Sequence, residues 1–265
     1  MLVTKMPEMK ATWLLGALLA SLMVITVFAV TAVAPTEDDM GDTQRILYVH
    51  VPIAWLALLS FAVMTIAGIQ YLRHRDLAWD CWTFAAAELG WLCCGLTLVT
   101  GSLWAREEWG TWWTWDPRLT TLFVLWMIYS GCLLARGSMS DAHQRARICA
   151  SLAMLGSIDL PLVIMATRWF RGIHPVSPAM EPTMRFVLYF SLFSFSVFFV
   201  VLLVCRARQI RLETMLPELF RALPSRNSAI ATQCHLPCHW AVARPARPSD
   251  RVSRKARSRD LAIRG

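Results

Sequence analysis

Charged side chains are scarce in this sequence of 265 residues. They make up 17% of the chain, against about 25% in an ordinary soluble domain, while hydrophobic residues reach 56%. A disordered chain needs the opposite balance, and a soluble enzyme would expose more charge on its surface. The composition therefore excludes disorder for most of the chain and argues against an ordinary cytosolic enzyme.

Positive charge has no excess over residues 1–205, although the whole chain carries +8. The net charge of this part is −1, and residues 206–265 account for +9. A basic excess confined to one tail indicates membrane topology or attraction to anionic lipid, not a nucleic-acid-binding fold. We expect residues 211–265 to form a basic, disordered cytoplasmic tail, with membrane lipid and no nucleic acid among the partners.

Long hydrophobic runs are plentiful, and six of them suit a bilayer, which needs about 20 residues of helix. They are Ala11–Ala34, Ile46–Tyr71, Cys81–Trp104, Leu119–Ala135, Ile148–Thr167 and Met184–Val204. The fourth is the shortest, and we expect its outer end to continue into the Trp-rich residues before it. Because lipid cannot satisfy backbone polar groups, the runs predict an all-α integral membrane protein with a six-helix domain over residues 1–210.

Lysine and arginine are few on one side of the predicted bundle. The side with loops 35–45, 105–118 and 168–183 holds six, and the opposite side holds 20. By the positive-inside rule, both termini face the cytoplasm and these three loops face outward. The outer loops contain no cysteine, which argues against a thiol–disulfide relay in an oxidising compartment.

Only two of the six histidines fall on the outward side. His50 lies about four residues into the second predicted span, and His174 lies in the outer loop before the sixth. Neutral imidazole binds haem iron and several other metals, so two imidazoles on one face could share a ligand. Topology alone leaves open that they are two unrelated interfacial histidines.

Between these histidines, residues 109–120 read WGTWWTWDPRLT, with four Trp in seven residues. An interfacial aromatic belt explains one or two Trp at a helix end, but not this cluster. Large rigid rings interspersed with Gly, Asp and Arg suit a platform for a flat, apolar ligand. Arg45, Arg106 and Arg118 would suit anionic groups at its edge. Two imidazoles, a Trp shelf and peripheral arginines together match haem with its propionates.

The same segment resembles the tryptophan-rich signature of the haem-handling WWD family, in the form carried by its CcmC members. Residues 45–52, RILYVHVP, look like the family's stretch around one His. Residues 168–175, RWFRGIHP, look like its stretch around another, with Ile173 in place of the usual Leu and Phe170 in place of a second Trp. The resemblance covers about residues 10–215 and includes the six-span layout.

This resemblance implies a part in the maturation of c-type cytochromes. Such proteins present haem at the outer face of the membrane to the haem chaperone CcmE. They are associated with the ABC-type subunits CcmA and CcmB, where ATP hydrolysis lies, and with the small protein CcmD. The chain would be a carrier subunit and not an enzyme, in a bacterial inner membrane with its site facing the periplasm. Its cargo would be haem b, held transiently and without a covalent bond.

The motif match also implies roles for single residues in and around the WWD segment, residues 104–120. His50 and His174 would be the axial ligands of the haem iron. The haem platform and chaperone contact would be formed by Trp109, Trp112, Trp113, Trp115 and Asp116. Arg45 and Arg118 would be candidates for contact with the propionates.

Three other functions compete with a haem carrier. WWD-family cytochrome c synthases tend to be larger, with more spans and more outward histidines. A bis-His cytochrome b normally holds its haem between facing helices inside the bilayer. A permease would favour discontinuous helices or internal repeats, which the sequence does not clearly show. A single outward pair, with His174 in a loop, favours the carrier.

Three further features remain outside these motifs. Glu88 and Asp159 lie inside predicted spans, where an acid is a functional-site hypothesis by default. We find no Lys or Arg partner for them within the spans and expect a structural, hydrogen-bonded role. Pro161, two residues after Asp159, can kink the fifth helix. In the tail, residues 234–239, CHLPCH, fit the spacing of neither a structural zinc site nor a haem attachment motif.

Overall fold

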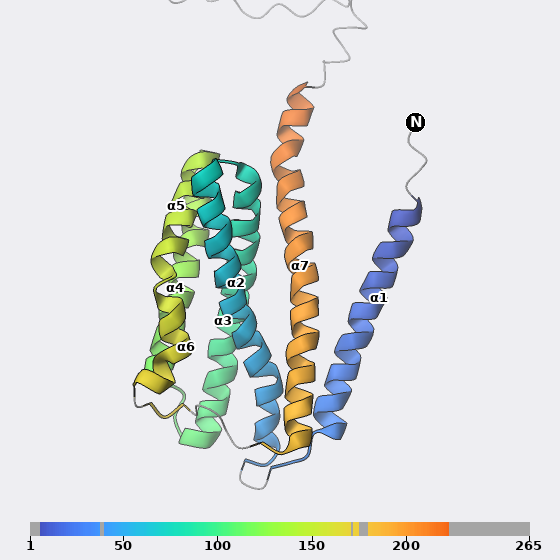
Figure 1. The fold of residues 1–265 in the computed structure, drawn as a ribbon, viewed down its shortest axis with the longest axis vertical. Helices are drawn as coiled ribbons and strands as arrows, with labels where there is room; N and C mark the ends of the chain where they lie inside the picture. The colour runs from blue at the N-terminus through green and yellow to red at the C-terminus, as the bar shows by residue number, and fades with distance from the viewer. Residues whose placement is uncertain (1–5, 38–39, 171, 175–179, 223–265) are drawn as a thin grey trace, which may run out of the picture. The chain divides into compact units, whose positions relative to one another are not determined.

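The computed structural model describes residues 6–37, 40–170, 172–174 and 180–222, and the regular structure of these residues is helical (Figure 1). The chain divides into two compact units, residues 1–217 and 218–265. The helical bundle belongs to the first unit. The CHLPCH segment and residues 223–265 of the predicted tail lie outside the described residues, whereas residues 211–222 belong to the last helix.

Seven α-helices and two short helical turns follow one another along the described chain. They are α1 (Met6–Phe28), the π-helical η1 (Ala29–Val33), the 3₁₀-helical η2 (Asp42–Ile46), α2 (Leu47–His74), α3 (Leu77–Trp109), α4 (Pro117–Ser138), α5 (Ala142–Gly156), α6 (Asp159–Trp169) and α7 (Pro182–Ala222). They provide six helical stretches that are long and apolar enough to cross a membrane, with α5 and α6 sharing one of them. The prediction of six such helices is confirmed.

The helix ends follow from single residues. Asp76, Asp116 and Asp141 each accept a backbone hydrogen bond in the first turn of α3, α4 and α5, at 2.6 to 2.9 Å. Gly110, with φ of 71°, ends α3 in a left-handed conformation that glycine adopts without strain. The expectation that the fourth helix continues into the Trp-rich residues was wrong. It is α3 that reaches Trp109, because the Asp116 cap starts α4 only after them.

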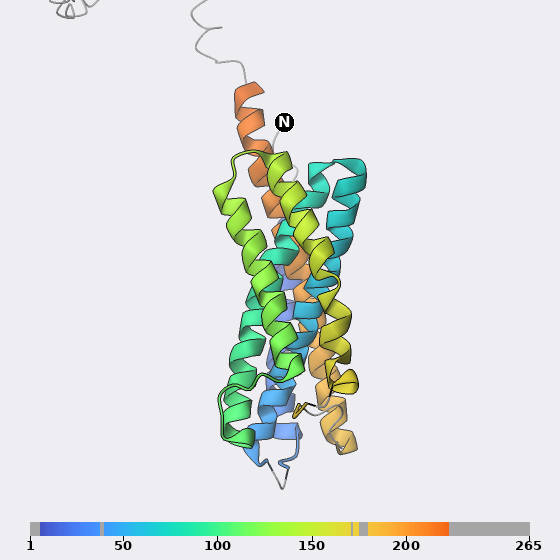
Figure 2. The ribbon, with the colours of Figure 1, turned by 90° about the vertical axis from the view of Figure 1, so that its left-hand side faces the viewer.

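The fifth membrane stretch is broken in its middle. One helix was expected over Ile148–Thr167, but α5 ends at Gly156 and α6 starts at Asp159 (Figure 2). Pro161 then falls in the first turn of α6, where a missing N–H costs little. Ser157 and Ile158 between the two helices keep right-handed helical angles, so the proline accompanies a short interruption of the kind that the predicted kink describes.

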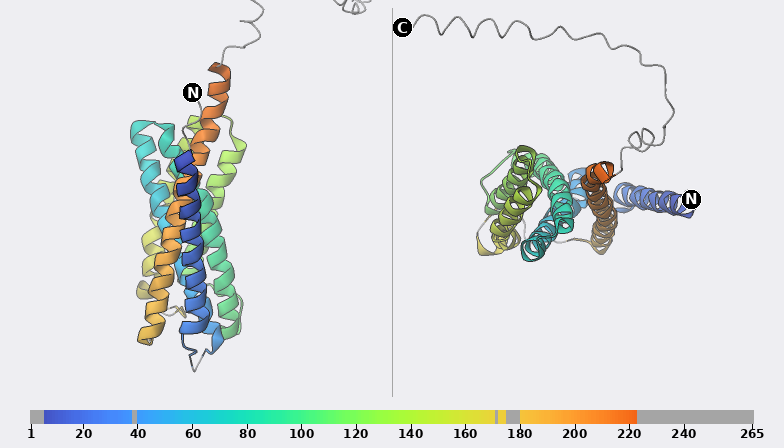
Figure 3. Two further views of the ribbon diagram at one scale, coloured as in Figure 1. Left: turned by 90° about the vertical axis from the view of Figure 1, so that its right-hand side faces the viewer. Right: turned by 90° about the horizontal axis from the view of Figure 1, so that it is seen from above.

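Small residues bring the central helices close together. Tyr129 of α4 packs over Gly90 of α3, where no Cβ would fit, and its hydroxyl donates to the Ala57 carbonyl of α2 at 2.8 Å. Gly68 of α2 similarly faces Ala150 of α5. Such close approach is the usual basis of helix association in membranes. In contrast, α1 lies at one edge of the bundle, beside α7 (Figure 3).

Two ion pairs join the helices inside the bundle. Arg136 of α4 donates to both carboxylate oxygens of Asp80 in α3, at 2.7 and 2.9 Å. Arg206 of α7 donates to both oxygens of Glu88, at 2.6 and 2.8 Å. The expectation that Glu88 has no basic partner was therefore wrong. The predicted span ended at Val204, but α7 continues beyond it and carries Arg206 to Glu88. Asp159 differs: its Oδ2 is buried and has no hydrogen-bond partner among the described residues.

The cysteines form no disulfide within the described part of the chain. Cys81, Cys93, Cys94, Cys132, Cys149 and Cys205 are all free thiols. All but Cys205 are at least partly buried within the bundle, where a free thiol packs as a small apolar side chain.

Candidate functional site

A cavity of about 640 Å³ lies toward the end of the bundle at which α2 and α4 begin and α3 ends. Figure 1 shows these helix ends at the same end of the bundle. Its walls come from α2, α3, α4, α6 and α7, and they are mainly apolar. The sequence-predicted site residues that line it are His50, Trp109, Trp113, Arg118 and His174. The fold thus brings both histidines that were predicted to face outward, from distant parts of the sequence, to one cavity.

His50 is fixed between two helices. It lies in the first turn of α2, and its Nδ1 is 2.9 Å from the hydroxyl oxygen of Thr100 in α3. Its Cε1 lies 3.0 Å from the position that a Cβ on Gly101 would occupy. Any larger residue at position 101 would press on the imidazole, so α3 determines where the ring lies.

His174 lies outside the helices and is held by Asp116. One carboxylate oxygen of Asp116 accepts from the backbone N–H of Ile173 at 2.8 Å and of His174 at 3.5 Å, and the other caps α4. Gly172 passes so close to this carboxylate that a Cβ there would clash with it. The His174 ring also meets Trp109 edge to face, with centroids 6.4 Å apart. Asp116 thereby links the Trp-rich segment to the second histidine.

The four tryptophans of the predicted platform divide into two pairs. Trp109 and Trp113 line the cavity, and Trp109 is supported edge to face by Trp104 at 5.2 Å between centroids. Trp112 and Trp115 do not line it, and Trp112 is 56% exposed. The rings that line the cavity and the rings that are exposed outside it are therefore different residues of this segment.

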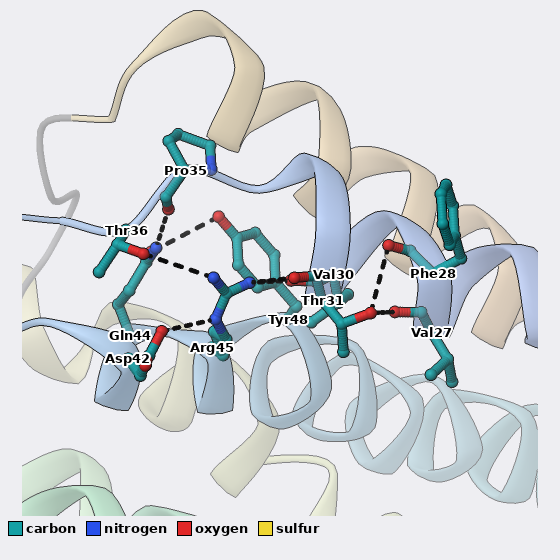
Figure 4. Close-up of polar contacts among 10 residues, drawn as sticks. All are labelled: Val27, Phe28, Val30, Thr31, Pro35, Thr36, Asp42, Gln44, Arg45 and Tyr48. Carbon is teal, nitrogen blue, oxygen red and sulfur yellow. Dashed lines mark hydrogen bonds and ion pairs between the residues drawn. The ribbon is translucent and has the colours of Figure 1, made fainter.

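The two arginines proposed for anionic groups also differ. Arg118 lines the cavity, and its guanidinium has no hydrogen-bond or salt-bridge partner among the described residues. Arg45 is outside the lining. It donates to the carbonyls of Val30 and Thr31 and to Asp42, and so ties η1, which follows α1, to η2, which precedes α2 (Figure 4).

Several lining residues were not identified from the sequence. The clearest are Trp55 of α2 and Phe193 of α7, which complete the apolar wall together with Trp104 of the predicted WWD segment. Thr100, which contacts His50, was missed as well. A signal for α3 exists, because Thr97, Gly101 and Trp104 recur at helical spacing and mark the cavity-facing side. In a membrane helix the other sides are apolar as well, so the side that faces a cavity is hard to recognise from the sequence.

The donor set limits which metal the cavity can hold. Among the described residues, no three His, Cys, Asp or Glu side chains lie close enough to hold a metal ion together. A protein-bound free metal usually takes three or four protein ligands. Two imidazoles instead suit a metal whose other positions are already filled, as in a porphyrin.

Comparison with known proteins gives consistent matches. A family model described as CcmC, heme exporter protein C, matches residues 3–219. Heme exporter protein C of Escherichia coli K12 is 32% identical over 202 residues, which cover 72% of this chain and 81% of that protein. The protein of the same name from Paracoccus denitrificans is 30% identical over 182 residues, which cover 66% of this chain and 76% of that protein. That from Bradyrhizobium diazoefficiens is 36% identical over 151 residues, and the match spans 57% of its length.

Proposed function

Because this chain belongs to the heme exporter protein C (CcmC) family, we propose that it binds haem at the outer face of the membrane for the maturation of c-type cytochromes. It then presents this haem to the chaperone CcmE. One observation carries the proposal: His50 and His174 line a single cavity together with Trp109, Trp113 and Arg118. Haem is the cargo in this proposal, bound transiently and without a covalent bond.

The residues present fit such a cargo. A volume of about 640 Å³ lies within the range of roughly 300–1,000 Å³ that is usual for sites of this size class. Trp109 and Trp113 offer aromatic surface to a flat apolar ring. The guanidinium of Arg118 has no hydrogen-bond or salt-bridge partner among the described residues and could bind a carboxylate of the ligand. Two imidazole ligands would leave the iron no open position for oxygen chemistry.

The proposed setting is a bacterial inner membrane, with both termini in the cytoplasm and the cavity toward the periplasm. The six membrane-compatible helices and the distribution of Lys and Arg support it. The proposed partners are CcmE, CcmD and the ABC-type subunits CcmA and CcmB, with ATP hydrolysis in a partner. Membrane lipid surrounds the helices.

The test is the absorption spectrum of the full chain, purified in detergent after expression with haem available. Wild type is expected to show the bands of low-spin, six-coordinate haem. His50→Ala and His174→Ala are each expected to lose or alter them, whereas His74→Ala, at the far end of α2 and exposed, is a matched control and keeps them. No haem in wild type, or the same spectrum in all four proteins, would sink the proposal.

A second prediction separates holding haem from passing it on. Trp113→Ala is expected to weaken haem binding about tenfold, because a ring that lines the cavity is lost. Trp112→Ala, outside the lining, is expected to keep its haem but to load CcmE more slowly. Haem content and covalent haem on co-expressed CcmE are the two measurements. A double variant that matches wild type in both would contradict a role for these rings.

A further inference from the structure

His50 is contacted from α3 by a residue that none of the recognised motifs includes. The hydroxyl oxygen of Thr100 lies 2.9 Å from Nδ1 of His50. Thr100 precedes the last residue of α3, Trp109, by about two and a half turns, and a carbonyl of α3 determines what its hydroxyl can do.

The direction of this hydrogen bond follows from a second contact. The Thr100 hydroxyl oxygen also lies 2.8 Å from the carbonyl oxygen of Leu96, and a carbonyl can only accept. A hydroxyl has one proton, which goes to Leu96. Its lone pair then faces His50 and accepts the proton that Nδ1 carries.

This arrangement decides which nitrogen can bind a metal. A neutral imidazole carries a single N–H, so a proton on Nδ1 leaves a lone pair on Nε2. Nε2 has no hydrogen-bond partner among the described residues, and His50 lines the cavity. Gly101 leaves room for the His50 ring in this position, because a Cβ on residue 101 would lie 3.0 Å from Cε1 of His50.

We propose that Thr100 is a positioning residue for His50: it accepts the Nδ1 proton and so presents Nε2 to the cavity as the iron ligand. The part that concerns iron rests on the proposed function, but the choice of tautomer does not. Partners of this kind orient a ligating histidine and raise its basicity, and their loss typically costs about 10- to 100-fold in metal affinity.

The first experiment needs no haem. Nitrogen-15 NMR of the full chain in detergent, labelled at histidine, reports which ring nitrogen is protonated, and the His50 signals are identified by their loss in His50→Ala. Wild type and Thr100→Ser are expected to carry the proton on Nδ1, and Thr100→Val to lose this preference. A His50 protonated on Nε2 in wild type, or an unchanged tautomer in Thr100→Val, would overturn the inference.

The second experiment measures haem affinity and reduction potential in the same proteins. Thr100→Val is expected to bind haem about 10- to 100-fold more weakly, with a higher potential, and Thr100→Ser to restore both. Thr83→Val is the matched control, since its hydroxyl also donates to a carbonyl within α3 but is absent from the cavity lining. An unchanged affinity and potential in Thr100→Val would overturn the positioning role. If wild type binds no haem, the proposed function fails, and the NMR result still judges the tautomer.

Discussion

Replacing Asp116 by alanine is expected to weaken haem binding about 10- to 100-fold, although His174 itself is unchanged. Asp116 is 6% exposed, and its carboxylate accepts backbone hydrogen bonds from Arg118 at 2.9 Å and Ile173 at 2.8 Å. Hydrogen bonds to a charged group contribute about 1.5–3 kcal/mol each. Without them, the start of α4 and the segment of His174 lose their common anchor, so the second imidazole is no longer held at the cavity.

The measurement is a haem titration of the detergent-purified protein followed by its absorption spectrum. Asp116→Ala is expected to resemble His174→Ala, and Gly172→Ala to shift affinity in the same direction, because its Cβ presses on the same carboxylate. Asp141→Ala is the matched control: it removes the equivalent cap from α5, away from the cavity. Haem binding by Asp116→Ala as tight as that of Asp141→Ala would contradict the anchoring role.

The second large effect concerns stability. Asp80→Ala is expected to destabilise the fold by about 3–5 kcal/mol, because it leaves Arg136 charged and unpaired in the bundle. The two side chains are each 9% exposed, and the guanidinium also packs 4.0 Å from the ring centroid of Phe84. Little water can therefore compensate the lost carboxylate. Thermal unfolding in detergent measures the change.

Two further variants sharpen this test. Asp80→Leu combined with Arg136→Met replaces the ion pair by apolar groups and is expected to recover most of the stability. Glu88→Ala breaks the other ion pair, but its partner Arg206 is 29% exposed and lies 3.7 Å from Glu213. Its cost is expected to be near 1 kcal/mol or less. Equal unfolding temperatures for Asp80→Ala and Glu88→Ala would contradict the ranking.

The number of membrane helices could be predicted because bilayer thickness alone fixes the length of an apolar run. The helix ends could not, because they depend on single residues whose effect is not apolar. Asp116 and Gly110 leave the Trp-rich segment between α3 and α4, and α7 extends beyond its apolar residues so that Arg206 reaches Glu88. Hydropathy carries no information on either.

For the candidate site, too, some features could be predicted from the sequence and others could not. Topology placed His50 and His174 on one side, and the structure brings them to one cavity. The sequence could not separate Trp113, in the lining, from Trp112, outside it, because neighbouring residues in an irregular segment have no fixed facing. Thr100 was missed for another reason. Its role depends on which side of α3 meets α2. The spacing of Thr97, Gly101 and Trp104 marks the cavity side of α3, but nothing in the sequence shows that Thr100 faces His50.

The two histidines are supported by different kinds of structure, and this difference affects the expected residence time of bound haem. His50 belongs to a helix of 28 residues and is braced by a second one. His174 follows the end of α6, outside the helices, and its backbone N–H and that of Ile173 donate to Asp116. Displacing the first imidazole means deforming α2, whereas displacing the second moves a segment that lies outside regular structure. Residence time is therefore expected to be governed at His174: slow departure from the isolated carrier, and rapid associative exchange when an acceptor supplies a competing ligand.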